Sequence, residues 1–385
     1  MLELLFLLLP VAAAYGWFMG RNSVRQEQRE AQKEFSKNYV TGINLLLSDQ
    51  SDKAVDYFTE MLDVDSETLE THWTLGKLFR RRGEIDRAIK IHQNLITRPS
   101  LTETQRFQAM LELGRDYLSA GFYDRAEKML SELAQQRIYR KESEHYLLQL
   151  YEATNEWDKA IKIALKIRRY NKDIEPTIAQ FYCELAELQE TSADTLKFYE
   201  KALFHDKACV RARIALGRWY IGQSQGKTAI DYLLPVLKQA PDFASEVLPL
   251  LEQAYQLNND EQGLLSCLHD LVMENASATA VIMLARHITE QNDEAAAEQF
   301  LLTALRRNPT MRGFQTLIDV HVAQASPGKE RDALELLSSI VAEQVKRRPK
   351  YRCRHCGFSA QQLYWHCPSC KAWGEIQPLR GLDGE

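Results

Sequence analysis

The sequence predicts an all-α protein, in which a superhelical solenoid of helix pairs connects an N-terminal transmembrane helix to a small C-terminal metal-binding module. Three observations support this: an apolar run at the start of the chain, a recurring glycine–alanine pattern through the middle, and four cysteines in two close pairs near the end. The chain has 385 residues, enough for two or three domains. Its net charge of -5 is mild, which argues against a general nucleic-acid-binding protein.

The apolar run covers residues 4–20. A helix of this length reaches about 25 Å, a little short of the ~30 Å hydrocarbon core of a bilayer. Trp17 can lie at the membrane interface, and Arg21 can extend to the lipid headgroups. We therefore predict a transmembrane anchor at residues 1–20, followed by a juxtamembrane segment at 21–35.

A cleaved signal peptide is the alternative, because residues 12–14 are three alanines that resemble a cleavage site. Against it, no lysine or arginine precedes the apolar run, whereas Arg21, Arg25 and Arg29 follow it. The positive-inside rule then directs the N-terminus outward and the rest of the chain into the cytoplasm. We expect a single-pass anchor and a cytoplasmic body, whose thiols stay reduced.

The middle of the chain contains a glycine followed twelve residues later by an alanine, at four places. The pairs are Gly42 and Ala54, Gly76 and Ala88, Gly114 and Ala126, and Gly217 and Ala229. Three of these alanines, together with Ala160, end a triplet of aspartate, a basic residue and alanine. The alanines of successive triplets lie 34, 38 and 34 residues apart, so this part of the chain is an internal repeat.

This pattern resembles the tetratricopeptide repeat, in which each unit of about 34 residues forms two antiparallel helices. Glycine in the first helix and alanine in the second allow the two helices to approach closely. The triplet aspartate would lie near the start of the second helix, where it can cap free amides and meet the positive end of the dipole. The pattern continues more weakly to Ala333, although Leu148 and His321 break its small-residue rule. We predict about nine units over residues 36–345, with a concave face that binds proteins or peptides.

Two Cys-x-x-Cys pairs lie near the end of the chain, ten residues apart. They are Cys353 with Cys356 and Cys367 with Cys370. Each pair makes a turn that directs two sulfurs to one point, so two facing turns give a tetrahedral site for one zinc or iron ion. Two disulfides are the alternative, which a reducing cytoplasm disfavours. Four thiolates complete the site, so we expect His355 and His366 not to coordinate the metal.

Other residues that resemble functional sites have structural explanations. Cys183, Cys209 and Cys267 are expected to be plain buried residues of the repeats. Residues 222–228 resemble a phosphate-binding loop, but three residues separate the two glycines instead of four, and no strand is expected before them. The sequence contains no His-Glu-x-x-His motif, so we predict a protein that is not an enzyme.

Five aromatic residues surround the cysteines. They are Tyr351, Phe358, Tyr364, Trp365 and Trp373. A module of this size cannot bury enough apolar area to fold alone, so the metal and these rings must supply its stability. We expect the rings to form its core or to pack it on the last repeat; a partner-binding patch is the alternative.

Residues 346–354 contain six basic side chains and no acid. They are either a solvated linker or a contact for an anionic membrane surface, an acidic partner or RNA. We place the boundary of the metal-binding module here, at residues 346–385.

The chain as a whole resembles the lipopolysaccharide assembly protein B family. The first ten residues and the segment from Tyr351 to Gly384 match the two ends of that family, and the repeats between them have the right length and order. The resemblance implies a terminal module similar to rubredoxin, with the four cysteines as its metal ligands. It also implies a non-enzyme in the inner membrane of Gram-negative bacteria, facing the cytoplasm.

The resemblance further implies an adaptor that promotes degradation of the deacetylase LpxC by the membrane protease FtsH, and thereby restrains lipopolysaccharide synthesis. A second membrane protein, PbgA (also called YejM), is expected to oppose it, and other lipopolysaccharide assembly proteins are expected to gather on it. Nucleic acid is not an expected partner. From the residues alone, two alternatives stay open: a membrane-tethered rubredoxin-like electron carrier and a zinc-ribbon scaffold that binds nucleic acid.

Overall fold

The computed structural model describes residues 15–23, 26, 40–42, 44–45, 53, 66–99, 101–189, 192–274, 277–291, 294–382 and 384. The chain divides into two compact units, residues 1–155 and 156–385. Most of the predicted anchor and juxtamembrane segment lies outside the described residues, and residues 15–23 are helical. Within the described part of the chain, no helix combines the length and the apolar character needed to cross a bilayer.

The first unit contains five long helices within its described residues. They are α4 (Ser66–Arg81), α5 (Ile85–Ile96), α6 (Glu103–Ala120), α7 (Tyr123–Leu133) and α8 (Arg140–Ala153). Helix α6 begins with a capping box, in which the side chains of Thr102 and Gln105 each accept a hydrogen bond from the other's backbone amide. It ends at Gly121, whose φ of 77° is the left-handed conformation that stops a helix.

Three of the four triplet aspartates lie in the first turns of α5, α7 and α9, where the helix dipole favours a negative charge; the fourth, Asp52, lies outside the described residues. The sequence had suggested that these aspartates cap the helices, and this prediction was wrong. The N-cap positions belong to Glu84, Phe122 and Glu156, and none of these makes a side-chain capping bond. Each aspartate is therefore already inside its helix, and its contribution comes from the dipole.

A buried ionic cluster joins α4 to α6 and was not predicted. Arg80 donates to Asp116 at 2.6 Å and to Glu112 at 2.7 Å, and both carboxylates are at most 1 % exposed. Burial alone would raise the pKa of Glu112, but the hydrogen bond from Arg80 and the positive charges of Arg115, Arg80 and Lys77 together outweigh burial and lower it. The cluster therefore keeps its charges inside the unit and fixes how these two helices meet.

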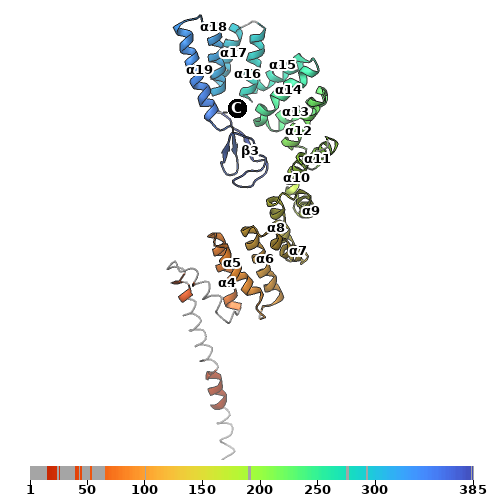
Figure 1. Ribbon diagram of the computed structural model, residues 1–385, viewed down its shortest axis with the longest axis vertical. Helices are drawn as coiled ribbons and strands as arrows, with labels where there is room; N and C mark the ends of the chain where they lie inside the picture. The colour runs from red at the N-terminus through yellow and green to blue at the C-terminus, as the bar shows by residue number, and fades with distance from the viewer. Residues whose placement is uncertain are drawn as a thin grey trace, which may run out of the picture. The chain divides into compact units, whose positions relative to one another are not determined.

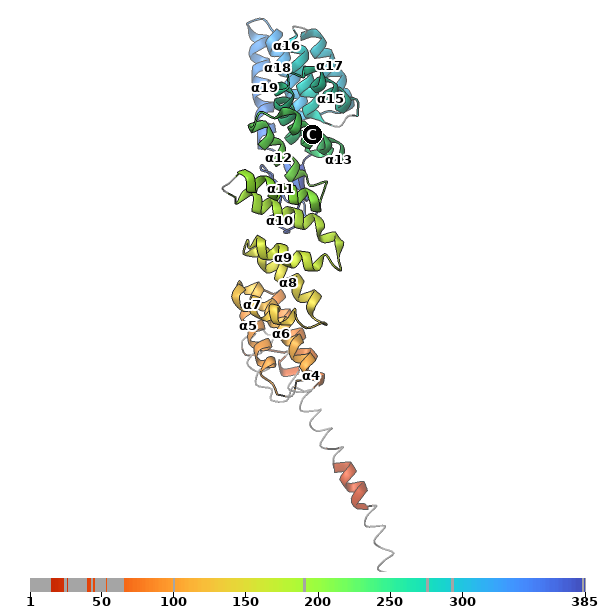
Figure 2. The same ribbon diagram turned by 90° about the vertical axis from the view of Figure 1, so that its right-hand side faces the viewer.

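The second unit contains the remaining helices. They are α9 (Trp157–Ile167), η1 (Lys172–Ile174), α10 (Glu175–Glu187), α11 (Ser192–His205), α12 (Val210–Gly222), α13 (Gly226–Gln239), η2 (Pro241–Phe243), α14 (Ala244–Leu257), α15 (Glu261–Met273), α16 (Ala278–Glu290), α17 (Glu294–Arg307), α18 (Met311–Gln324) and α19 (Lys329–Arg347). Figures 1 and 2 show them stacked in chain order. The described chain is thus a tetratricopeptide-like helical solenoid with a small strand module, as predicted.

The loop that resembles a phosphate-binding loop is the turn between two helices. Helix α12 ends at Gly222 and α13 begins at Gly226, and Ser224 between them has a φ of 59°. A Cβ atom at Gly226 would lie 2.4 Å from the Ala254 carbonyl oxygen. This glycine therefore allows α13 to approach α14, which is a packing role and not a phosphate-binding role.

We expect Gly217→Ala to destabilise the second unit by about 1–2 kcal/mol, because overpacking costs about 1–3 kcal/mol and alanine returns part of this through its helix propensity. A Cβ atom at Gly217 would lie 2.5 Å from two carbons of Leu233 on the paired helix. The measurement is the midpoint of thermal unfolding, which should fall by about 2–4 °C per kcal/mol. Gly222→Ala on the same helix is the control, because nothing lies within 4 Å of its Cβ position. Equal midpoints for the two variants would contradict close packing at Gly217.

Candidate metal centre

The metal-binding module is built on a short three-stranded sheet directly after α19. Its strands are β1 (Tyr351–Cys353), β2 (Ser359–Ala360) and β3 (Ile376–Pro378). The order is β2-β1-β3, and β1 is antiparallel to both neighbours. Strand β1 therefore carries the first cysteine in the middle of the sheet, and the register pairs it with Ile376.

The first cysteine pair lies in a tight turn at residues 353–358. The Cys353 amide donates to the Phe358 carbonyl at 2.8 Å, and the Gly357 amide donates back to the Cys353 carbonyl at 3.0 Å. Gly357 has a φ of 78°, a left-handed conformation that glycine adopts without a Cβ clash. The glycine therefore allows the turn to close tightly around the first cysteine pair.

The second pair lies in an equivalent turn at residues 367–372. The Cys367 amide donates to the Ala372 carbonyl at 2.9 Å, and the Lys371 amide donates to the Cys367 carbonyl at 2.9 Å. Lys371 takes the position of Gly357 and has a φ of 60°. The two turns are thus copies of one backbone motif, and the second places a lysine in a conformation that usually requires glycine.

The two turns bring the four predicted ligand sulfurs together. The Sγ atoms of Cys353 and Cys370 are 3.8 Å apart, those of Cys356 and Cys367 are 3.7 Å apart, and all four lie within 4.8 Å of one another. Zinc–sulfur bonds of about 2.3 Å arranged as a tetrahedron place neighbouring sulfurs about 3.8 Å apart. The cluster therefore fits one tetrahedral ion, and the predicted cofactor, one metal held by four cysteines, is confirmed.

The thiols share their protons unequally. The Phe358 amide lowers the pKa of Cys356 to about 6. The Ala372 amide acts in the same direction on Cys370, but burial and the three neighbouring sulfurs outweigh it and raise its pKa to about 12. A bound cation favours the thiolate at every position, so metal binding releases the remaining protons.

Neither histidine of the motif joins the sulfurs. His355 is exposed to solvent. The ring of His366 stacks on Trp373 at a centroid distance of 4.2 Å, and its Nε2 lies 3.0 Å from the Lys371 carbonyl oxygen. Both histidines thus behave as the sequence predicted, and His366 helps to hold the second turn against the aromatic residues.

The cysteines of the repeats lie outside the metal site. Cys183 and Cys209 are buried, and their Sγ atoms are 4.0 Å apart, within reach of a weak sulfur hydrogen bond and not joined by a disulfide. The prediction for Cys267 was wrong in part, because this residue is only half-buried. It lies on α15 between the buried face of the helix and the exposed residues Ser266 and His269.

Trp373 attaches the module to the helices. Its ring lies 5.9 Å from that of Trp157 on α9 and 5.8 Å from that of Phe181 on α10, both edge to face. Trp365 stacks on Phe243 of η2 at 5.7 Å, with an interplanar angle of 12°. Such pairs contribute stability beyond the area they bury. The rings therefore fix the module on the helices instead of forming an open patch.

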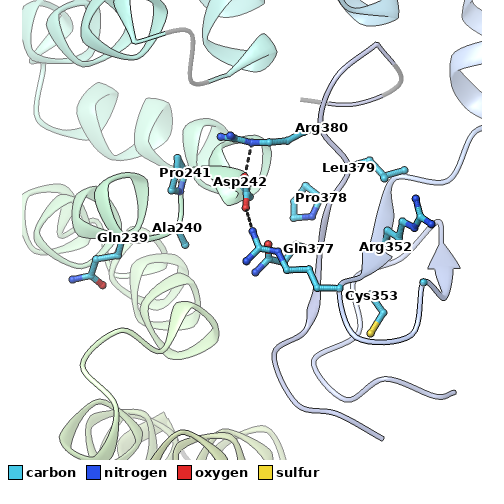
Figure 3. Close-up of a pocket in the computed structure, with 12 residues that line it drawn as sticks. Gln239, Ala240, Pro241, Asp242, Arg352, Cys353, Gln377, Pro378, Leu379 and Arg380 are labelled. Carbon is cyan, nitrogen blue, oxygen red and sulfur yellow. Dashed lines mark hydrogen bonds and ion pairs between the residues drawn. The ribbon is translucent and has the colours of Figure 1, made fainter. Parts of the chain in front are cut away.

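Polar contacts reinforce this attachment. The Tyr351 hydroxyl donates to Glu246 of α14 at 2.6 Å. Arg354 and Arg380 both pair with Asp242 of η2, beside a cavity of about 780 Å³ (Figure 3). Burial, followed by the contact with Glu246, raises the pKa of the Tyr351 phenol. From the sequence, Tyr351 was expected in the aromatic core and Arg354 in a basic linker; the structure shows that both also contact the helices.

Tyr351 and Phe358 belong to the module's own core, as predicted, but the expected packing on the last repeat was wrong. The module's rings contact α9, α10 and η2, where the apolar partners lie. The last helix pair contributes polar contacts: Gln361 donates to the Arg348 carbonyl at 2.6 Å, and the Met311 amide donates to the Leu382 carbonyl at 2.8 Å. The module thus lies alongside earlier helices of the second unit (Figure 1).

The left-handed conformation shared by Lys371 and Gly357 predicts that substitutions at these two positions change the stability of the module in opposite directions. We expect Lys371→Gly to stabilise the metal-loaded module by about 1 kcal/mol, because glycine removes the left-handed strain, and Gly357→Ala to destabilise it by about as much. The measurement is the rate at which an excess chelator removes the metal from the full chain. It should fall about fivefold in the first variant and rise about fivefold in the second. Rates that move in the same direction would contradict the equivalence of the two turns.

Comparisons with known proteins agree with this geometry. Residues 351–378 match the family model described as rubredoxin metal binding domain. The fold and the site together define a helical-repeat protein with a rubredoxin-type metal-binding module.

The chain belongs to the lipopolysaccharide assembly protein B family, as its sequence had indicated. It is 46% identical over 389 residues to lipopolysaccharide assembly protein B of Escherichia coli strain K12, with 100% of both chains covered. It is 37% identical over 396 residues to the protein of the same name from Haemophilus influenzae strain Rd, with 98% of both chains covered. A solved tetratricopeptide repeat protein from Parabacteroides merdae ATCC 43184 covers 72% of this chain and 100% of its own, at 11% identity and a TM-score of 0.34.

Proposed function

We propose that this protein is a non-catalytic adaptor, anchored in the bacterial inner membrane through residues 1–20, whose cytoplasmic body regulates lipopolysaccharide biosynthesis. The observation that carries the proposal is the 46% identity, over the full length of both chains, with a relative named lipopolysaccharide assembly protein B. The apolar run before Arg21 supports the membrane anchor and its orientation.

The adaptor brings the membrane protease FtsH to the deacetylase LpxC and promotes degradation of LpxC. An adaptor of this kind needs a tether and a firm protein-binding surface, and it needs no active site of its own. The docking of the metal module by Trp365 and Trp373 supports this role, because it combines strands and helices into one surface within residues 156–385. PbgA opposes the adaptor, and other lipopolysaccharide assembly proteins gather on the same body.

The metal has a structural role in this proposal. Its four cysteines cross-link the two turns of the module, so the ion stabilises the surface that carries the docking rings. The same four thiolates hold zinc or iron, and the structural role requires no change of oxidation state.

The test is a pull-down from detergent-solubilised membranes, read by mass spectrometry. The intact chain should recover FtsH and LpxC, and a variant with all four metal-site cysteines changed to serine should lose at least one of them. Cys267→Ser is the matched control, because Cys267 lies outside the metal cluster. Recovery of neither protein by the intact chain, with redox proteins or ribosomes in their place, would support an electron carrier or a nucleic-acid scaffold instead.

A second arm tests the anchor. Deletion of residues 2–20 should leave a folded body that no longer lowers LpxC levels in cells. If the anchorless body controls LpxC as well as the intact chain does, tethering is not part of the mechanism.

A further inference from the structure

A cavity of about 230 Å³ lies between the metal module and the helices. Its lining combines side chains from α10 and β3 with three aromatic rings. The rings are Phe243, Trp365 and Trp373, and the polar side chains include Gln180, Gln377 and Asp206. One water molecule occupies about 30 Å³ of liquid, so the cavity has room for a planar polar group and part of its stem.

Two carboxamide oxygens in this lining have no hydrogen-bond partner. Gln180 is 8 % exposed, its Nε2 donates to the Cys209 sulfur at 3.8 Å, and its Oε1 is buried and unpaired. The Oε1 of Gln377, which comes from the module side, is also buried and unpaired. Buried acceptors of this kind normally have a partner, so the cavity is complementary to a ligand that donates hydrogen bonds.

The charge of the lining indicates which donor. Among the described residues that line the cavity there is no lysine, arginine or histidine, and Asp206 contributes a carboxylate. One oxygen of Asp206 accepts from the Ala208 amide at 2.9 Å, which holds the group in place. Trp365 and Trp373 also bring electron-rich rings to the lining, and such rings attract a cation that lies over them.

We propose that this cavity binds the guanidinium group of an arginine side chain that a partner protein supplies. A guanidinium is planar and stacks on indole rings, carries five N–H donors and keeps its charge. It therefore matches two amide oxygens, a carboxylate and aromatic walls at once. The ligand would touch both the module and the helices, so its binding would also hold the two together.

The test uses the full chain in detergent, labelled with 5-fluorotryptophan and followed by fluorine NMR. The chain has six tryptophans, and Trp→Phe variants at positions 365 and 373 assign the two signals of interest. Methylguanidinium chloride should shift these two signals to saturation, with a dissociation constant on the order of 1 mM for so small a ligand. N-acetylarginine amide, which carries the same group on a peptide-like backbone, should do the same.

Methylurea separates charge from hydrogen bonding, because it has a similar shape and N–H donors but no charge. It should bind at least about tenfold more weakly than methylguanidinium. Gln180→Leu should weaken methylguanidinium binding by about tenfold or more, since it removes one acceptor at similar volume. Gln256→Leu, an exposed position on α14, is the control and should change nothing.

Three results would overturn the proposal. Equal binding of methylurea would mean that the site does not select a cation. The absence of any saturable shift would mean that water fills the cavity. Binding of methylguanidinium without binding of N-acetylarginine amide would mean that the cavity cannot accept a side chain from a partner.

Discussion

Cys367→Ser should release the metal and unfold the module, while Cys267→Ser should change neither. Cys367 is fully buried, supplies one of the four sulfurs, and its backbone forms the second turn. Changes beyond the direct ligands of a metal already reduce affinity by about 10–100-fold, so loss of one of four ligands should cost at least a hundredfold. In small metal modules the binding free energy is largely the folding free energy, so the fold should be lost with the ion.

The measurement combines metal content per chain with limited digestion by trypsin. The intact chain should retain about one ion and resist cleavage at Arg352, Arg354 and Lys371, because the module is folded. The serine variant should lose the ion and be cut at these positions. A variant that keeps stoichiometric metal and an uncut module would contradict the four-cysteine site.

Trp373→Ala should detach the module from the helices and leave its metal in place. Truncation of a buried tryptophan costs about 3–5 kcal/mol, and because Trp373 is half-buried we expect about 2–3 kcal/mol. The loss falls on the contacts with Trp157 and Phe181, which join the module to α9 and α10. Trp373 is not one of the four cysteines of the metal site, so the module should keep all its ligands.

Hydrogen exchange read by mass spectrometry checks this prediction. Peptides from α10 and from the module should exchange about 30- to 140-fold faster in the variant, because each 1.4 kcal/mol is a factor of ten. Tyr364→Ala is the matched control: this ring is 42 % exposed and contacts Phe358 inside the module. If both variants exchange alike, Trp373 does not anchor the module. If Trp373→Ala loses its metal, docking and metal binding are one cooperative event.

The sequence predicted those features that depend on local spacing. Two Cys-x-x-Cys turns direct their sulfurs by backbone geometry alone, so the four ligands were identified without a fold. Gly217 and Ala229 were identified as contact residues because helical periodicity and small size suffice to define a close approach.

The sequence did not predict features that depend on distant partners. Nothing near Trp373 indicates that Phe181 will be its neighbour, and the pairing of Asp242 with Arg354 and Arg380 joins segments far apart in the chain. The positive φ of Lys371 was not predicted either, because lysine, unlike glycine, does not indicate a left-handed conformation. The equivalence of the two cysteine turns was the one clue that would have revealed it.

The position of the docked module also has a consequence for synthesis. Phe181 and Phe243 are made well before the tryptophans that cover them, and a ribosome adds roughly 5–20 residues per second. During translation, these apolar rings of α10 and η2 therefore face water for on the order of ten seconds. They are covered only when the module has been made, has acquired its ion and has folded back. Metal supply thus determines how long a newly made chain exposes this apolar surface to chaperones and proteases.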